Sequence, residues 1–369
     1  MTTSKNYSSS FLKLNNYHLF LILKNKILII FSLLIQYVML DNSIITESGK
    51  INDYLYHVDL KEFGVPRVLS SFIAEFQDGI IFLDCGTSLE IEKLLKFARK
   101  NNIDLHNVKY LIPTHHHFDH AGGMWKLYKR IKEYSPDVKI LTNKKTMKLL
   151  NDYEFHLNRA KRTFGKFIGE MEEIEENAFE LIEPVEKVEA LNSSKSSIMT
   201  FHINDSEITL KIIKSPGHTP DHQCPIFMKN GEIDFIFFGE AVGTIYHSSE
   251  LVTMPTSMPV FYNHKTYTKT LQKFKKINAN MAGFCHFGVV RGKENVDYIL
   301  EEHKKFIDSF REKIIEYYQE KPKTRYVVRQ IMPYLSKRTD LVGEEHPVMK
   351  NIVLGVVYGM MMDLGYRKD

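Results

Sequence analysis

The chain has 369 residues, of which 43% are hydrophobic, 12% aromatic and 25% charged, and its net charge is +4. This composition excludes a disordered chain, a collagen and a coiled coil, and it leaves room for one large domain or two. Three cysteines without a CxxC pair cannot form a disulfide framework, so we expect a reducing, cytoplasmic location.

The positive charge gathers near the N-terminus. Five lysines against two acidic residues give residues 1–50 a charge of +3, so the rest of the chain carries +1. A body this close to neutral lacks the basic surface that nucleic-acid binding requires. The charge distribution therefore argues against a nucleic-acid partner and leaves a small molecule as the expected one.

Residues 1–48 form an apolar and basic extension. The uninterrupted apolar run at 27–40 has 14 residues, whereas a membrane-spanning helix needs about 20. Three interpretations stay open: a weak membrane anchor at 19–40, a buried helix, or a true translation start at Met39 with the upstream residues never translated. We favour the last, and only a real anchor would make the membrane a partner.

Strand and helix patterns alternate over the main domain, which we place at 49–295. The predicted strands are at 51–62, 70–76, 80–84, 109–113, 138–141, 201–214, 235–238 and 282–284, and the predicted helices at 89–101, 121–134 and 265–277. The first of these strands has the pattern of an edge strand. Asp78-Gly79 between two apolar runs predicts a β-hairpin, and the alternation over 201–214 predicts another.

Two helical regions depart from this rhythm. Residues 144–183 are charged and predicted to be helical, including the run MEEIEE at 171–176; they form either a solvated face or an insert that covers a site. Residues 296–369 are predicted to form a helical, or winged-helix-like, C-terminal region with helices at 294–320, 326–335 and 349–364. Gly365 suits the end of the last helix. The Met-rich run at 359–362 indicates a core or an interface, so a homodimer stays open.

Residues 114–123 read THHHFDHAGG and follow a short apolar strand. Because side chains two apart can point the same way, His115 and His117 can hold one metal ion while Asp119 and His120 reach a neighbouring one. Imidazole and carboxylate groups suit zinc, iron or manganese. The HxHxDH pattern therefore predicts a metal site.

Three more polar residues follow predicted strands. His218 lies in SPGHTPDH, Glu240 in GEAVG and His286 in CHFG. Since α/β proteins gather their sites at strand ends, these residues are candidates for the same site.

Through DCG, HxHxDH, PGHTPDH, GExxG and the last strand-end histidine, residues 50–295 resemble the metallo-β-lactamase-fold hydrolases, and they are similar to the lactonase and glyoxalase-II-like members. The resemblance implies an α/β fold, an αββα sandwich with a two-metal centre at one edge. It implies a first metal site of His115, His117 and His218, and a second of Asp119, His120 and His286. His117 and Asp119 are the implied catalytic residues.

Glu240 lies where this family has a bridging aspartate. Because glutamate is one methylene longer, it either bridges the two metals or binds one of them. Asp84, which closes a strand, is implied to orient the histidine loop. His116 and His222 match variable positions, and Asp221 replaces the usual glycine.

Other residues near these motifs are weaker candidates for a role in the site. Cys224 and Cys285 are close to metal ligands in sequence but at no ligand position, so we expect them to be structural. Tyr246 and Tyr262 follow Glu240 in the chain, and either hydroxyl is a candidate for contact with the substrate.

The resemblance implies a hydrolase in which a hydroxide bridging two divalent metal ions attacks a small ester, thioester or lactone. Zinc is the favoured metal, with iron and manganese as alternatives. A diiron protein that reacts with oxygen or nitric oxide is the second hypothesis, since Glu240 makes the site richer in carboxylate. An RNA-processing nuclease is the third, suggested only by the tail.

Overall fold

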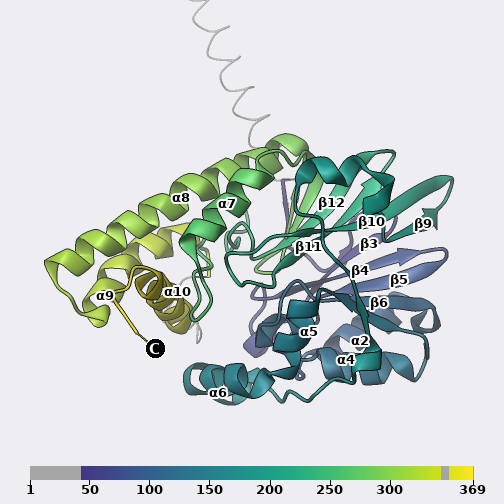
Figure 1. Cartoon of the computed structure of the whole chain (residues 1–369), viewed down its shortest axis with the longest axis horizontal. Coiled ribbons are helices and arrows are strands. Elements are labelled where there is room, and N and C mark those ends of the chain that lie inside the picture. Colours follow the sequence, from purple (N-terminus) through teal and green to yellow (C-terminus); the bar gives the residue numbers. More distant parts are fainter. Residues whose placement is uncertain (1–42, 342–348, 369) are drawn as a thin grey trace, which may run out of the picture. The chain divides into compact units, whose positions relative to one another are not determined.

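The computed structural model describes residues 43–341 and 349–368 (Figure 1). The interpretations of the N-terminal extension concern residues 1–42 and lie outside the described residues. From Ile44 the chain forms one unit, and its first strand, β1 (Ile44–Ile45), pairs with β14 (Val289–Arg291). The folded domain therefore begins at residue 44 rather than at the predicted boundary of 49.

One sheet contains the histidine loop at the end of a strand. Its strands, in spatial order, are β2 (Gly49–Lys50), β3 (Leu55–Asp59), β4 (Ser70–Phe76), β5 (Gly79–Leu83), β6 (Val108–Ile112), β7 (Lys139–Thr142) and β8 (Phe179–Leu181). The Asp78-Gly79 hairpin is confirmed between β4 and β5. The strand expected at an edge is β3, which lies one position inside the sheet because β2 pairs with it.

The other sheet has the order β1, β14, β13 (Ala279–Phe284), β12 (Glu232–Gly239), β11 (Gln223–Lys229), β10 (Ser206–Lys214) and β9 (Met199–Ile203). The predicted hairpin over 201–214 is confirmed as β9 and β10. Strand β11 was not predicted. It contains Pro225, which is rare inside sheets, yet it pairs along its whole length with β10.

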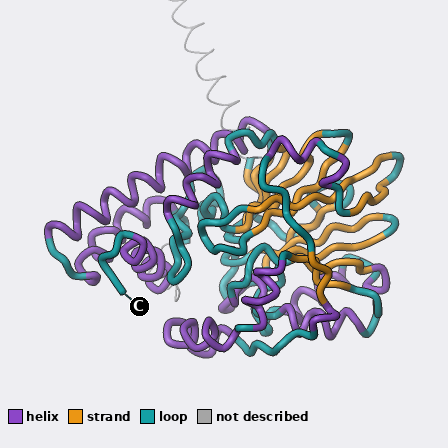
Figure 2. Tube along the Cα trace, in the orientation of Figure 1, coloured by secondary structure: helices purple, strands orange, loops and turns teal. Residues whose placement is uncertain are grey.

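Helices flank the two sheets and form the insert and the C-terminal appendage (Figure 1). They are α2 (Ile91–Lys100), α3 (Phe118–Ala121), α4 (Met124–Lys132), α5 (Lys144–Asn151), α6 (Tyr153–Phe164), α7 (His264–Phe274), α8 (Lys293–Glu320), α9 (Thr324–Leu335) and α10 (Met349–Asp363). Figure 2 shows the strands of the two sheets between these helices. This is the expected αββα sandwich with a C-terminal helical appendage.

Three apolar cores hold the layers together. Aromatic side chains fill the space between the sheets, where the ring centroids of Phe72 and Phe237 are 4.9 Å apart. The predicted stripe of α2 is buried against the first sheet described, with α4 beside it. The third core joins the other sheet to α7 and to the C-terminal helices.

The insert is only partly helical. Helices α5 and α6 form, but the expected helix over 171–176 does not, and the segment runs in an irregular conformation into β8. Its backbone makes other hydrogen bonds: Asn151 Nδ2 donates to Ile174 O at 2.9 Å, and Ile174 N donates to Asn151 Oδ1 at 3.0 Å. The paired side-chain bonds to Asn151, together with the burial of Ile174, replace the predicted helix.

The C-terminal helices pack on the sandwich. The three predicted helices are confirmed as α8, α9 and α10, and Gly365 follows the last one with a φ of 74°. Met360 and Met361 are buried in the same core as the sheet. The described parts of this region, 293–341 and 349–368, contain no strand of the kind a winged helix needs. Across the described residues, no helix combines the length and apolarity needed to cross a membrane.

We predict that α10 depends on the absence of a side chain at Gly359. A Cβ at Gly359 would lie 2.0 Å from Ser257 O, whereas one at Gly355 would meet only the flexible Met258 side chain, at 2.7 Å. Gly359→Ala should therefore lose roughly 1–3 kcal/mol of unfolding free energy. Gly355→Ala, the matched control, should be neutral or gain from its higher helix propensity.

Thermal and urea unfolding of the two variants beside the unmodified chain would measure this difference. Equal stability of the two variants would contradict the close packing of α10 on residues 257–258.

Candidate metal centre

The candidate ligands lie at the ends of strands from both sheets. The histidine loop follows β6, and His117 is the residue before α3. His218 follows β10, Glu240 follows β12 and His286 follows β13. The strand ends from the two sheets meet at one edge of the sandwich, so residues far apart in the chain converge there.

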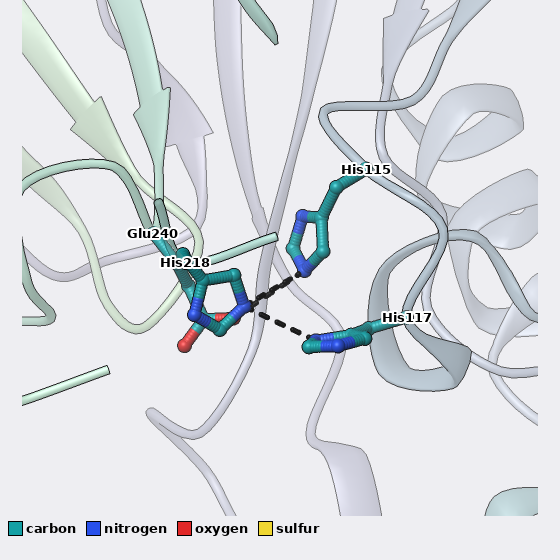
Figure 3. Close-up of side chains that lie close together, drawn as sticks. All are labelled: His115, His117, His218 and Glu240. Atoms are coloured by element: carbon teal, nitrogen blue, oxygen red, sulfur yellow. Dashed lines mark hydrogen bonds and ion pairs between the residues drawn. The ribbon is translucent and has the colours of Figure 1, made fainter. Parts of the chain in front are cut away.

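The first group of ligand atoms comes from His115, His117, His218 and Glu240, all within 4.8 Å of one another (Figure 3). His218 Nε2 lies 3.2 Å from His115 Nε2 and 3.1 Å from His117 Nδ1. It lies 2.6 Å from Glu240 Oε2. Ligands at about 2.0–2.1 Å from a tetrahedral zinc ion are themselves roughly 3.3 Å apart. The histidine nitrogens are close to the spacing of ligands on one four-coordinate ion, whereas the 2.6 Å contact of Glu240 with His218 is shorter than that spacing.

A second group lies beside the first. Asp119 Oδ2 is 3.4 Å from His120 Nε2 and 3.4 Å from His286 Nε2. Glu240 Oε2 is 3.4 Å from His120 Nε2 and also 3.4 Å from His115 Nε2. One oxygen of Glu240 therefore contacts ligands of both groups. Its longer side chain still brings the carboxylate between them.

Cys285, which the sequence led us to expect as a structural residue, lies beside the second group. Its sulfur belongs to a group with His120 and His286, within 4.8 Å of their ligand atoms. Cys224 is different, because its thiol donates to Ser215 Oγ at 3.1 Å and belongs to neither group. Cys285 is thus an additional candidate ligand beside the second group, and only its position just before His286 could have suggested it.

The outward ring nitrogens of two ligands are bonded to the backbone. His218 Nδ1 donates to Thr256 O at 2.6 Å, and His286 Nδ1 donates to Val68 O at 2.5 Å. Such bonds place the ring proton on the outer nitrogen and leave the lone pair of Nε2 directed into the site.

Asp84 supports the histidine loop from below. Its carboxylate accepts from Thr114 N at 2.7 Å and from Thr114 Oγ1 at 2.8 Å. His120 Nδ1 donates to Asp84 Oδ2 at 3.3 Å, and His115 Nδ1 donates to Thr114 Oγ1 at 3.0 Å. Asp84 thus reaches one ligand of each group, and its φ of 50° is a conformation that non-glycine residues rarely adopt.

The residues after His218 also position the site. Asp221 Oδ1 accepts from His116 Nδ1 at 2.8 Å, and its other oxygen accepts from the His116 backbone N–H at 3.0 Å. His222 Nε2 accepts from Glu240 N at 3.2 Å, and its Nδ1 donates to Ser215 Oγ at 2.7 Å. The sequence analysis gave Asp221 and His222 no such role. Their place in PGHTPDH was the only signal.

The protonation states of the first group suit a metal. Burial lowers the pKa of His115 and of His117 well below the usual value, so both rings are neutral. Burial alone would raise the pKa of Glu240, but His218 and the other imidazoles lower it well below its usual value. Neutral imidazoles and an ionised carboxylate are the forms that bind divalent ions.

One nitrogen of the second group makes no hydrogen bond within the described residues, although two carboxylates lie near it. His120 Nε2 is buried and, within the described residues, has no hydrogen-bond partner. Burial lowers the pKa of His120, but the Asp119 carboxylate outweighs burial and raises it well above the usual value. A divalent ion would replace this proton and satisfy the nitrogen. The donor set therefore fits a pair of divalent metal ions.

Comparison with known proteins agrees with this geometry. The family model described as the metallo-beta-lactamase superfamily matches residues 64–233. Residues 64–233 are therefore assigned to the metallo-β-lactamase superfamily. The search of curated proteins finds no match.

Solved structures similar to this chain include proteins of the same superfamily. An archaeal superfamily protein, ST1585 from Sulfolobus tokodaii, is 18% identical with a TM-score of 0.56, and the match covers 84% of this chain and 98% of that one. BJP-1, a subclass B3 metallo-beta-lactamase of Bradyrhizobium japonicum, is 16% identical with a TM-score of 0.44, covering 71% and 92%. MEM-A1, a subclass B3 enzyme from a soil metagenome library, is 13% identical with a TM-score of 0.47, covering 72% and 96%. At 18% identity, the likeness to ST1585 concerns the fold alone.

A cavity of about 640 Å³ opens onto the ligand groups. His117, Asp119, Glu240 and His286 line its floor, and α6, α10 and residues 255–261 line its walls. The insert therefore covers one side of the site, as one interpretation of residues 144–183 expected. The C-terminal helix on the other side was not foreseen.

The two candidate tyrosines are placed differently. Tyr246 is buried and lines the cavity, with its ring centroid 5.8 Å from that of His286. Tyr262 hydrogen-bonds to His264 Nδ1 at 3.2 Å and is not among the described residues that line the cavity. Only Tyr246 is therefore placed to contact a bound substrate.

We predict that Asp84→Asn lowers the affinity for zinc by about 10–100-fold, because the amide cannot accept all the bonds that orient the histidine loop. Asp104→Asn, an exposed acid that accepts from His106, is the matched control and should leave the affinity unchanged. Competition with a chromophoric chelator measures the affinity, and circular dichroism checks the fold. An unchanged affinity in Asp84→Asn would contradict the supporting role.

Proposed function

We propose that the protein is a dinuclear metal-dependent hydrolase that cleaves a small ester, thioester or lactone, in the manner of the lactonase and glyoxalase-II-like members of its superfamily. The observation that carries this proposal is the position of Glu240. Its Oε2 atom lies within 3.4 Å of His115 and His120 and 2.6 Å from His218, so it contacts both ligand groups. A carboxylate placed between two groups of ligands can bind both ions of a two-metal centre.

When bound, two divalent ions supply a water of lowered pKa and a Lewis acid for the substrate carbonyl. His115, His117, His218 and Glu240 would hold one ion. Asp119, His120, His286 and Glu240 would hold the other. Zinc suits this set of nitrogen and oxygen donors best, and iron or manganese are the alternatives.

The cavity lining supports water as the nucleophile. Among the described residues that line it, there is no serine and no cysteine that could form an acyl-enzyme. The carboxylates of Asp119 and Glu240 are the proton acceptors at the floor of the cavity. This is the composition expected of direct hydrolysis.

Tyr246 is the proposed donor to the oxyanion. Burial, followed by the charge of Glu240, raises the pKa of Tyr246 well above its usual value, so its hydroxyl keeps its proton. A protonated phenol in the cavity wall can stabilise the negative charge that develops on a carbonyl oxygen during attack.

The cysteines and the cavity size bear on the cellular compartment and on the size of the substrate. The three cysteines, all within the described chain, are free and buried, which supports a reducing compartment such as the cytoplasm. The cavity dimensions support a small-molecule substrate.

A diiron protein that reacts with oxygen or nitric oxide is the second candidate. The observation in its favour is the pair of carboxylates, Asp119 and Glu240, that contacts His120 in the second group. A site of histidines and carboxylates with open positions suits non-haem iron.

Metal content decides between these functions. Protein produced with zinc and, separately, with iron should be assayed for metal per chain, visible absorbance and hydrolysis of lactone and thioester panels. We expect about two zinc ions, a colourless protein and hydrolysis. Two iron ions with a visible band and no hydrolysis would favour the diiron protein.

His117→Ala should abolish metal binding at the first group and hydrolysis together, because it removes one of four ligands. His106→Ala is the matched control, since His106 is an exposed histidine that contacts only Asp104 and Tyr134 among the described residues. Full activity in His117→Ala would refute the assignment.

A further inference from the structure

A buried acid that the proposed mechanism does not use lies beside the metal centre. Glu62 is in a short 3-10 turn, η1 (Glu62–Gly64), between β3 and β4, and only 1% of its surface is exposed. Within the described residues, neither oxygen of its carboxyl group has a hydrogen-bond partner. A buried polar group without a hydrogen-bond partner destabilises the folded state, because it has lost its bonds to water.

A second buried acid nearby shows the usual arrangement. Glu90 is 3% exposed, but its carboxylate accepts from the Thr87 hydroxyl and lies 3.5 Å from Lys93 Nζ. The fold therefore satisfies one buried carboxylate in this region and leaves Glu62 unsatisfied.

The turn holds Glu62 in place against backbone strain. Lys61 and Phe63 have φ angles of 49° and 56°, which are unfavourable for residues with a side chain. Asp59 accepts from Lys61 N at 2.9 Å, and the Phe63 ring stacks on Phe164 of α6 at 5.8 Å. Contacts with neighbouring residues therefore hold the backbone around Glu62 in a conformation that it would not adopt on its own.

The turn that carries Glu62 borders the cavity above the ligand groups. Glu62 lines the cavity together with Asp119 and His286, and the same loop accepts the hydrogen bond from His286 Nδ1 through Val68 O. Glu62 belongs to neither group of ligand atoms among the described residues. It is therefore an unpaired polar group in the wall of the cavity, and neither ligand group uses it.

Burial, and then the charges of Asp119 and Glu90, raise the pKa of Glu62 well above its usual value. A hydrogen-bond donor placed in the cavity would relieve this burial cost. A neutral N–H or O–H group suits this place better than an ammonium group, because two divalent ions beside it would repel a cation.

We propose that Glu62 is a specificity-determining residue that binds an N–H or O–H group carried by the substrate beside its reactive carbonyl. This inference rests on the proposed hydrolase function. It narrows the substrate class from esters, thioesters and lactones in general to those with a donor next to the carbonyl. A site with a buried acceptor disfavours the analogue without the donor, because the acceptor then stays unpaired.

The test uses two lactones that differ by one hydroxyl group, α-hydroxy-γ-butyrolactone and γ-butyrolactone. For the unmodified protein loaded with zinc, kcat/KM should favour the hydroxy-lactone. Glu62→Leu should lower that preference by about 10–100-fold, through loss of the hydroxy-lactone rate alone. Glu62→Gln, which keeps the shape and one acceptor oxygen, should retain part of the preference, and it also serves if the leucine variant does not fold. Glu92→Gln, an exposed acid on α2, is the matched control.

Measuring the binding of uncleaved analogues tests the role of Glu62 independently of the proposed hydrolase function. The corresponding lactams, 3-hydroxy-2-pyrrolidinone and 2-pyrrolidinone, resist hydrolysis, and their binding can be followed by ligand-observed NMR. Tighter binding of the hydroxy-lactam that is lost in Glu62→Leu supports the role of Glu62 even if neither lactone is hydrolysed. Equal binding of the two lactams by the unmodified protein would overturn it.

Two further results would also overturn the proposal. One is an unchanged lactone preference in Glu62→Leu. The other is a zinc content that falls from two to one in Glu62→Gln, since Glu62 would then act on the metal site and not on the substrate.

Discussion

Burial of imidazoles and carboxylates at one edge of the sandwich is the constraint on which this structure depends. Polar rings that leave water must keep their hydrogen bonds, and here each outward nitrogen of His218, His286 and His120 is bonded to a carbonyl or to Asp84. Those bonds orient the lone pairs toward one another. The same contacts that make burial tolerable therefore create the ligand set, so stability and metal binding share one network.

The surrounding elements convert this network into a cavity. Helix α6 comes from the insert and α10 from the C-terminal region, and both line the space above the ligands. Asn351 Nδ2 donates to Thr163 O at 3.2 Å, which joins the two helices directly. The stacking of Phe63 on Phe164 then ties α6 to the turn that carries Glu62. Selectivity for a substrate can thus depend on parts of the chain that hold no metal.

Much of the fold could be predicted because its signals are local. The stripe on α2, the Asp78-Gly79 hairpin and the three C-terminal helices follow from periodicity and turn chemistry, and the structure confirms them. The two elements that the sequence did not predict correctly, β11 and the 171–176 run, have identifiable causes. Strand β11 contains a proline, and the 171–176 run loses its helix because Asn151 takes both backbone bonds of Ile174. In that run, a tertiary contact outweighed helix propensity.

The sequence by itself determined which residue types stand at the strand ends, since HxHxDH, PGHTPDH and the last histidine are contiguous or follow recognisable strands. Only the tertiary structure decided how they meet. That Glu240 contacts both ligand groups, that Cys285 lies beside the second, and that Tyr246 and not Tyr262 faces the cavity are matters of distance between separate strands and loops. The missing partner of Glu62 belongs with them, because whether a buried group is satisfied depends on every element packed around it.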